Sequence, residues 1–209
     1  IYYSDIVSMF KSFFTGLIKP VDSFKMDFYF RLSILVLIGT IPAALAGIFL
    51  EDFFKSIFHN TNLVGVMLLV TGLILWSTRY IAIHNRKINI KNAIFIGIAQ
   101  MFAIFPGISR SGITISSGLF SKMSRKEAAR FSFLLAIPAI TGSMLFTIFD
   151  LISQHSVDLG LGILITGLVT SFIVGLLAIK FLLKVLESGK FSLFAPYCII
   201  IAILVLIFL

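Results

Sequence analysis

Uncharged apolar runs constrain the fold of this chain more than any other feature of its sequence. Residues 32–50 form nineteen consecutive positions without a charged side chain. A helix rises about 1.5 Å per residue, so a run of this length matches the roughly 30 Å hydrocarbon core of a bilayer. Four more runs have similar length and apolar character: 63–83, 131–149, 159–179 and 191–209. Together they predict an all-α polytopic membrane protein with about five to six transmembrane helices.

The composition of the chain supports this class. Of the 209 residues, 59% are hydrophobic, 12% are charged and 23 are phenylalanine, which exceeds what the core of a soluble domain needs. The net charge of +8 does not indicate nucleic-acid binding, because the basic residues concentrate in short loops. The single cysteine, Cys198, lies in an apolar run, so we expect neither a disulfide framework nor a cysteine-based metal site.

The distribution of lysine and arginine predicts the orientation of the chain. Basic loops lie in the cytoplasm by the positive-inside rule, and the acidic loops lie outside with the C-terminus. The cytoplasmic loops are then 19–31, 84–91, 121–130 and 180–190, and the outer loops are 51–62 and 150–158. Residues 1–18 resemble the tail of a preceding helix, and the chain opens on Ile1 rather than methionine. We therefore expect residues 1–209 to form a single integral membrane domain that is N-terminally incomplete.

A broken helix lies in the middle of the chain. Pro106 and Gly107 interrupt any helix that reaches them, because proline lacks a donor N–H and glycine favours no single backbone region. The apolar segments on either side, 93–105 and 115–120, are each too short to cross a membrane. Irregular backbone at membrane depth is tolerated only where it is buried in protein or lines a cavity. These features predict a re-entrant helical hairpin at about residues 92–120.

Polar side chains follow this break directly. Ser109, Arg110, Ser111 and Thr114 place three hydroxyls and one guanidinium within six residues. An arginine at membrane depth costs roughly 3 kcal/mol, and no acidic residue lies nearby in the sequence to offset that cost. A bound anion would do so, because a break followed by Ser-Arg-Ser-Gly can direct backbone N–H groups and a helix N-terminus at phosphate. The alternative is a serine-rich turn from which Arg110 reaches a lipid headgroup.

This pattern assigns candidate roles to the residues around the break. Arg110 would stabilise charge on a phosphate, and Ser109, Ser111 or Thr114 would act as the nucleophile or as a phosphate ligand. The candidate substrate-binding residues are Gln100, Pro106, Gly107 and Gly112. For Gln100 two interpretations stay open, since its amide could join the site or hydrogen-bond the hairpin.

The apolar runs supply neither a general base nor a metal site. All nine acidic residues and all three histidines lie in the N-terminal segment, in loops or at helix ends. His59, His84 and His155 lack the spacing of metal ligands, and we interpret them as loop residues. The glycines of the apolar runs are interpreted as small residues that let helices pack closely; they include Gly65, Gly72, Gly160, Gly162, Gly167 and Gly175.

Several of these residues also occur in the pattern of a known family. The run Pro106-Gly-x-Ser109-Arg110-Ser111-x-x-Thr114 resembles the second signature of the undecaprenyl-diphosphate phosphatase (bacitracin-resistance) family. The similarity extends to Gln100, to residues 41–43 and to residues 129–138, and covers essentially the whole chain. It implies a multi-pass enzyme of the bacterial cell (inner) membrane. That enzyme removes the terminal phosphate from undecaprenyl diphosphate, which recycles the lipid carrier of peptidoglycan synthesis and confers bacitracin resistance.

The resemblance also implies parts that this sequence does not contain. In the family, a glutamate-rich first signature and a Ser-Ser-Thr-Gly-His-like run carry the acid, base and metal-linked roles, and nothing in residues 1–209 matches them. We expect that the sequence begins after that signature and that these residues alone turn substrate over hardly at all. A divalent cation, magnesium or calcium, is implied by the resemblance only. The expected partners are a polyprenyl diphosphate and membrane lipids, and a homodimer stays open.

Two other functions are compatible with the same residues. A lipid-phosphate transporter or flippase can also bind its anion at a broken intramembrane helix. It differs from an enzyme in needing no carboxylate or histidine beside Arg110. A non-catalytic membrane scaffold would use Arg110 for stability alone.

Overall fold

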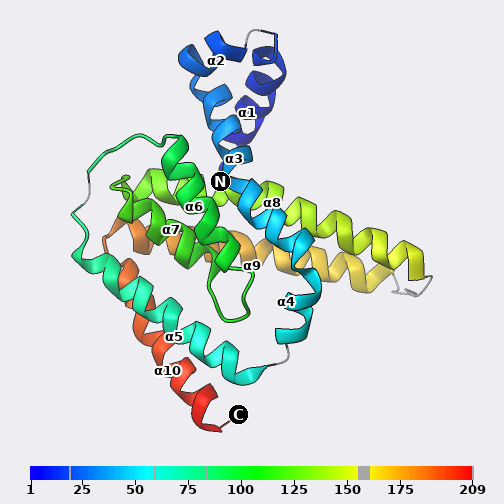
Figure 1. The fold of residues 1–209 in the computed structure, drawn as a ribbon, viewed down its shortest axis with the longest axis vertical. Helices are drawn as coiled ribbons and strands as arrows, with labels where there is room; N and C mark the ends of the chain where they lie inside the picture. The colour runs from blue at the N-terminus through cyan, green and yellow to red at the C-terminus, as the bar shows by residue number, and fades with distance from the viewer. Residues whose placement is uncertain (19, 59, 83, 155–160, 209) are drawn as a thin grey trace.

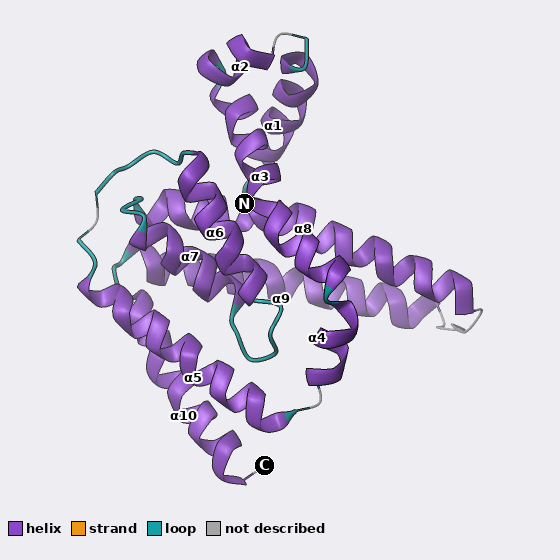
Figure 2. Cartoon of the chain, in the orientation of Figure 1, coloured by secondary structure: helices purple, strands orange, loops and turns teal. Residues whose placement is uncertain are grey.

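A computed structural model of the chain describes residues 1–18, 20–58, 60–82, 84–154 and 161–208. Every regular element in these ranges is helical (Figure 2), which confirms the all-α prediction. The α-helices are α1 (Tyr3–Gly16), α2 (Pro20–Met26), α3 (Phe28–Phe49), α4 (Glu51–Ile57), α5 (Thr61–Ser77), α6 (Ile90–Phe102), α7 (Arg110–Phe120), α8 (Arg125–Gln154), α9 (Leu161–Glu187) and α10 (Phe194–Phe208). Two short 3-10 helices, η1 (Thr78–Tyr80) and η2 (Phe191–Leu193), extend α5 and precede α10.

Five of the described segments are long and apolar enough to cross a membrane, as predicted. They are Phe28–Phe49, Thr61–Tyr80, Arg125–Phe149, Gly162–Glu187 and Phe191–Phe208. The start of α3 precedes the predicted residue 32 because Asp27 caps the helix. Its carboxylate accepts the backbone N–H of Tyr29 at 2.8 Å and that of Phe30 at 3.2 Å.

Two predicted loops contain short helices, and the sequence interpretation was wrong on both. Residues 20–26 of the first cytoplasmic loop form α2, which opens on Pro20, a residue suited to the first helical position. Residues 51–57 of the first outer loop form α4, where Lys55 and Glu51 pair at 2.6 Å along one helix face. Other residues interpreted as loop positions lie outside the described ranges: Lys19, His59, His155 and Asp158.

Small residues allow the closest helix contacts. α3 and α6 cross at Gly39 and Gly97, where a side-chain carbon on Gly97 would stand 2.3 Å from the carbonyl oxygen of Gly39. α5 and α10 run side by side in opposite directions (Figure 1), with Gly65 facing Leu206 and Gly72 facing Ile199. The packing role predicted for Gly65 and Gly72 is therefore confirmed.

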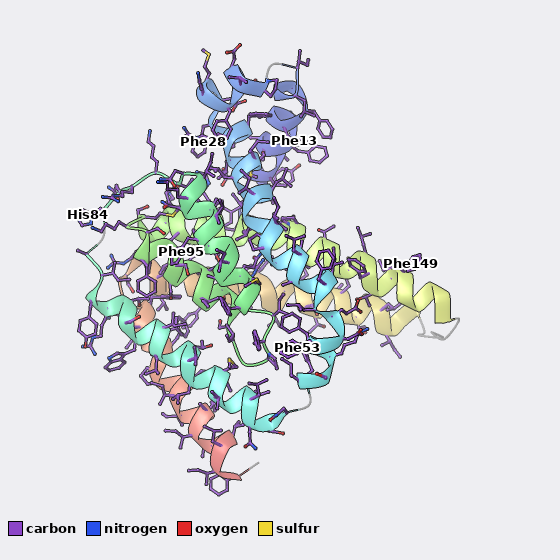
Figure 3. The ribbon with its side chains drawn as sticks, in the orientation of Figure 1. Phe13, Phe28, Phe53, His84, Phe95 and Phe149 are labelled. Atoms are coloured by element: carbon purple, nitrogen blue, oxygen red, sulfur yellow. The ribbon has the colours of Figure 1, made fainter. Side chains whose placement is uncertain are left out.

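The α8 and α9 helices project from the rest of the chain as a long pair (Figure 1), with Phe149 toward the far end of α8 (Figure 3). None of the residues in the apolar window of α9 is buried. Its glycines have open space around them, so the packing prediction was wrong for these three positions within the described structure. They are Gly162, Gly167 and Gly175.

Candidate functional site: a half-buried arginine in a helical hairpin

The site lies in a helical hairpin made of α6, the turn at residues 103–109, and α7. α6 has 13 residues and α7 has 11, so each is at most about 20 Å long and too short to cross a roughly 30 Å hydrocarbon core. Asn89 begins α6 by accepting the N–H of Asn92 at 2.9 Å. This is the arrangement that the predicted re-entrant segment requires.

The turn is held against α5 by a glycine. Gly107 has a φ of +95°, a backbone conformation that residues with a side chain rarely adopt. A side-chain carbon there would stand 2.4 Å from the carbonyl oxygen of Val64. Pro106 precedes it in the same turn. Gly107, one of the two residues that interrupt the helix, thus forms a close contact between the hairpin turn and α5.

Ser109 ends the turn and starts α7. Its hydroxyl oxygen accepts the N–H of Gly112 at 3.1 Å, so Ser109 is the N-cap and Arg110 is the first residue of the helix. Gly112 is itself buried beneath that cap, and a side-chain carbon on it would stand 2.9 Å from the Ser109 oxygen. Arg110 therefore leaves the backbone at the positive end of the α7 dipole.

Arg110 and Gln100 form the centre of the site. The Arg110 Nε–H donates to the Gln100 Oε1 at 3.0 Å, which joins the two arms of the hairpin. Two further donors of this pair, Arg110 Nη2 and Gln100 Nε2, are buried without a hydrogen-bond partner. The ion pairs of the described residues, Lys55–Glu51, Arg130–Asp5 and Arg130–Glu127, do not include Arg110.

Buried donors without partners are costly, because each forfeits its hydrogen bonds to water. An anion with several acceptor oxygens would satisfy both donors and the charge. The burial of Arg110 Nη2 favours this interpretation over the alternative in which Arg110 reaches out to a headgroup. Gln100 joins the two arms of the hairpin through its Oε1, and its unpartnered Nε2 leaves a donor that an anion at Arg110 could also use.

The three candidate hydroxyls are not equivalent. Thr114 is completely buried; its hydroxyl donates to the Arg110 carbonyl at 2.8 Å and is hydrogen-bonded to the hydroxyl of Ser132 on α8. Its position suits a brace for the first turn of α7 rather than a group that contacts phosphate. Ser109 keeps its own hydroxyl proton free while it caps α7, and the half-buried Ser111 makes no side-chain hydrogen bond in the described structure.

Two supporting residues were missed by sequence reasoning. Ser132 lies within the residues 129–138 that carried the family resemblance, but only the structure places its hydroxyl on Thr114. Thr71 on α5 contacts the turn through the Ser109 N–H and the Gly107 carbonyl. Neither contact has a sequence signal, because each joins residues 18 or more positions apart.

The described residues of the hairpin do not suit a divalent cation. Magnesium and calcium need several oxygen ligands, mostly carboxylates, whereas this site presents a guanidinium and amide N–H groups and its Gln100 oxygen is occupied by Arg110. Among the described residues, no three His, Cys, Asp or Glu side chains lie together as a metal site would require. His84 is exposed, and its Nδ1 lies 3.0 Å from the Ala82 carbonyl.

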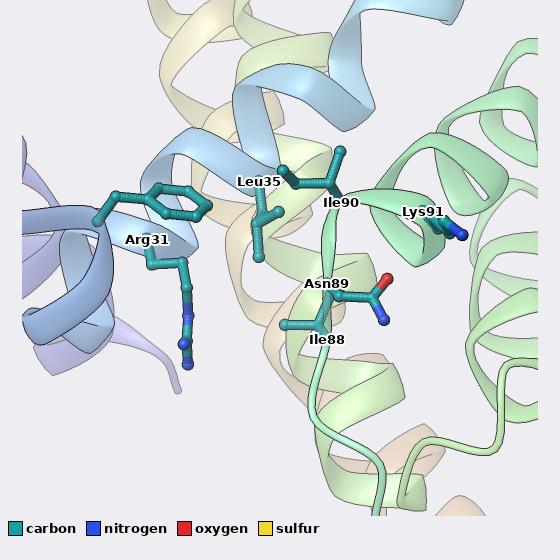
Figure 4. A pocket seen from close by; sticks show the side chains of 7 residues that line it. Arg31, Leu35, Ile88, Asn89, Ile90 and Lys91 are labelled. Atoms are coloured by element: carbon teal, nitrogen blue, oxygen red, sulfur yellow. The ribbon is translucent and has the colours of Figure 1, made fainter. Parts of the chain in front are cut away.

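A separate open pocket of about 490 Å³ lies between α2, α3 and the start of α6 (Figure 4). Leu35 and Ile88 lie between Arg31 on one side and Lys91 on the other, and the Lys91 side chain points away from Arg31. None of the predicted site residues lines it. The pocket is therefore distinct from the hairpin site.

Fold and site together define a multi-pass membrane protein with a half-buried arginine in a broken-helix hairpin, whose Nη2 is buried without a hydrogen-bond partner. The chain belongs to the family described as bacitracin resistance protein BacA, whose model matches residues 1–204.

Curated relatives agree with this family. The chain is 42% identical over 203 residues to an undecaprenyl-diphosphatase of Korarchaeum cryptofilum, covering 97% of this chain and 76% of that protein. It is 39% identical over 216 residues to an undecaprenyl-diphosphatase of Methanosphaera stadtmanae, covering 99% and 77%. It is 44% identical over 178 residues to one of Methanothermobacter thermautotrophicus, covering 82% and 97%.

Proposed function

We propose that this protein hydrolyses undecaprenyl diphosphate to undecaprenyl phosphate and inorganic phosphate, which recycles the lipid carrier of peptidoglycan synthesis and confers bacitracin resistance. The observation that carries the proposal is the pair of buried, unsatisfied donors on Arg110 and Gln100. The names of the relatives supply the substrate, since each of the three is an undecaprenyl-diphosphatase.

In this reaction the bond between the bridging oxygen and the terminal phosphorus breaks. The terminal phosphoryl group passes to water, either directly or through a serine, and the bridging oxygen leaves on the lipid monophosphate. Arg110 and Gln100 would bind the oxygens that gain charge as the bond breaks, and the N-terminus of α7 would add its dipole. Ser109 and Ser111 are the hydroxyls placed to act as nucleophile or phosphate ligand, while Thr114 braces the helix. The chemistry also needs a general base.

The lipid-phosphate transporter is not favoured as an alternative. It would use the same anion site, but the relatives that the chain matches are named as enzymes. The scaffold hypothesis leaves the two unsatisfied donors without a purpose.

The remaining features of the proposal concern location and partners. We infer that the protein resides in the cell membrane, the inner membrane in a bacterium, and that membrane lipids surround its apolar helices. A homodimer and a divalent cation are part of the proposal only as expectations from the family. Because the described hairpin does not suit such a cation, no step is assigned to one here.

The experiment that tests this function is phosphate release from undecaprenyl diphosphate by the complete encoded protein in detergent. Arg110→Ala should lower kcat/KM by about 10³-fold, because it removes the charge that stabilises the transition state. Arg86→Ala is the matched control, since Arg86 is exposed in a basic loop, and it should retain wild-type activity. An inactive wild type that still binds the lipid through Arg110 would favour the transporter, and equal activity of Arg110→Ala and wild type would refute an arginine site.

A further inference from the structure

We propose that Thr71 on α5 is a positioning residue for the phosphate site, and that its hydroxyl sets the angle at which α7 presents Arg110. This inference rests on the proposed function, and it names a residue from outside the hairpin as part of the machinery. The hydroxyl contacts the end of the hairpin turn at Gly107 and Ser109, and each of its contacts reaches the backbone rather than a side chain.

The contacts of Thr71 differ from those of an ordinary threonine in a helix. Its hydroxyl oxygen accepts the backbone N–H of Ser109 at 3.1 Å. Its proton faces two carbonyl oxygens, that of Gly107 at 3.2 Å and that of Met67 in its own helix at 3.0 Å. The side chain is 2% exposed, so water does not compete for these bonds.

These bonds fix the residue immediately before the arginine. Ser109 is the N-cap of α7, and its position decides where the helix begins and how its first residue, Arg110, leaves the backbone. The close approach of Gly107 to Val64 presses the same turn onto α5. Thr71 and Gly107 thus act together. Thr71 supplies the hydrogen bonds to the turn, and Gly107 has no side chain that would keep the turn away from α5.

The helix that carries Thr71 is itself well supported. Gly72, the next residue, packs against α10, where a side-chain carbon would stand 2.6 Å from Ile199. α5 and α10 lie side by side over their length (Figure 1). The anchor for the turn is therefore a paired helix, which limits the movement of the hairpin relative to it.

The competing interpretation is that Thr71 merely bonds its own helix, as threonines in apolar helices commonly do. Thr40 on α3 provides that comparison within the same chain. Its hydroxyl donates to the Val36 carbonyl at 2.8 Å and makes no other bond in the described structure. The two threonines share the bond to their own helix and differ in the bonds to the hairpin.

The test compares Thr71→Val, Thr71→Ser and Thr40→Val in the complete encoded protein. Valine keeps the shape of threonine and removes the hydroxyl, and serine keeps the hydroxyl. Thr71→Val should lower kcat for phosphate release from undecaprenyl diphosphate by about 10- to 100-fold, because a displacement near 1 Å at a reacting group has effects of this size. KM should change by less than about threefold, and Thr71→Ser and Thr40→Val should remain near wild type.

Hydrogen–deuterium exchange supplies a readout that does not depend on activity. In Thr71→Val the amides of residues 107–112 should exchange about tenfold faster, because the Ser109 N–H loses its acceptor. Neither Thr71→Ser nor Thr40→Val should change that exchange. Unchanged exchange in Thr71→Val would overturn the inference. An equal loss of kcat in Thr71→Ser and in Thr71→Val would also overturn it, because serine keeps the hydroxyl. If wild type releases no phosphate, the proposed function fails while the exchange comparison still decides the role of Thr71.

Discussion

Asp5 and Arg130 are 125 residues apart in the sequence and form a two-point ion pair that joins α1 to α8. The Arg130 Nη2 lies 2.6 Å from the Asp5 Oδ1, and its Nε donates to the Asp5 Oδ2 at 2.9 Å. The two side chains are only 15% and 13% exposed, and the guanidinium also lies 5.1 Å from the centre of the Phe28 ring. A shielded pair of this geometry links the first helix to the rest of the chain.

Asp5→Asn should destabilise the protein by about 2 kcal/mol, because it leaves the shielded Arg130 charge with only its longer contact to Glu127 at 3.5 Å. Thermal unfolding in detergent should show a Tm lower by about 4–8 °C for a chain of this size. Glu51→Gln is the matched control. Glu51 pairs with Lys55, and these side chains are 52% and 68% exposed respectively; such exposed pairs contribute about 0.5 kcal/mol or less. Equal Tm shifts for the two variants would contradict a structural role for the shielded pair.

Gln100→Glu should separate binding from stability at the phosphate site. The substitution keeps the acceptor for the Arg110 Nε–H, but it replaces the unsatisfied amide donor with a negative charge. We expect phosphate release to fall by about 100-fold, since one donor is lost and the substrate's own charge is repelled. The Tm should stay at or above that of wild type, because glutamate pairs with Arg110. Full activity in this variant would place Gln100 outside the site.

Gly107→Ala should distort the hairpin turn. The substitution adds a carbon at a φ of +95° and within 2.4 Å of the Val64 carbonyl, and the backbone strain alone costs about 1–3 kcal/mol. Activity should fall by about 100-fold as the turn moves off α5. Gly167→Ala on α9 has open space around it and should leave activity unchanged. Phosphate-release assays on the two variants provide the comparison.

Thr114→Val distinguishes a brace from a nucleophile. Because the Thr114 hydroxyl is buried and engaged with Arg110 and Ser132, its loss should lower kcat by about tenfold through a looser first turn of α7. A nucleophile would behave differently, since its removal leaves no turnover above background. Single-turnover measurements on Thr114→Val beside Ser109→Ala and Ser111→Ala decide which hydroxyl attacks.

The sequence predicted correctly those features that depend on residues close together along the chain. The five spans were predictable because a membrane admits few charges over about 20 residues. Their ends were less so, since the start of α3 depends on the Asp27 cap. The start of α8 follows a local pattern, because Ser124 and Glu127 have the spacing of a capping box and the Ser124 hydroxyl accepts the Glu127 N–H at 3.2 Å.

The sequence by itself determined the class of protein, the position of the broken helix and the identity of its arginine, because apolar runs, proline and glycine act within a few residues of themselves. Tertiary structure decided which groups meet that arginine. Gln100 lies on the facing arm of the hairpin, and Thr71 lies on a different helix. Such contacts depend on how closely helices approach one another, at positions such as Gly39 and Gly97. This packing brings together residues that are far apart in the sequence, so no local sequence pattern predicts the contact.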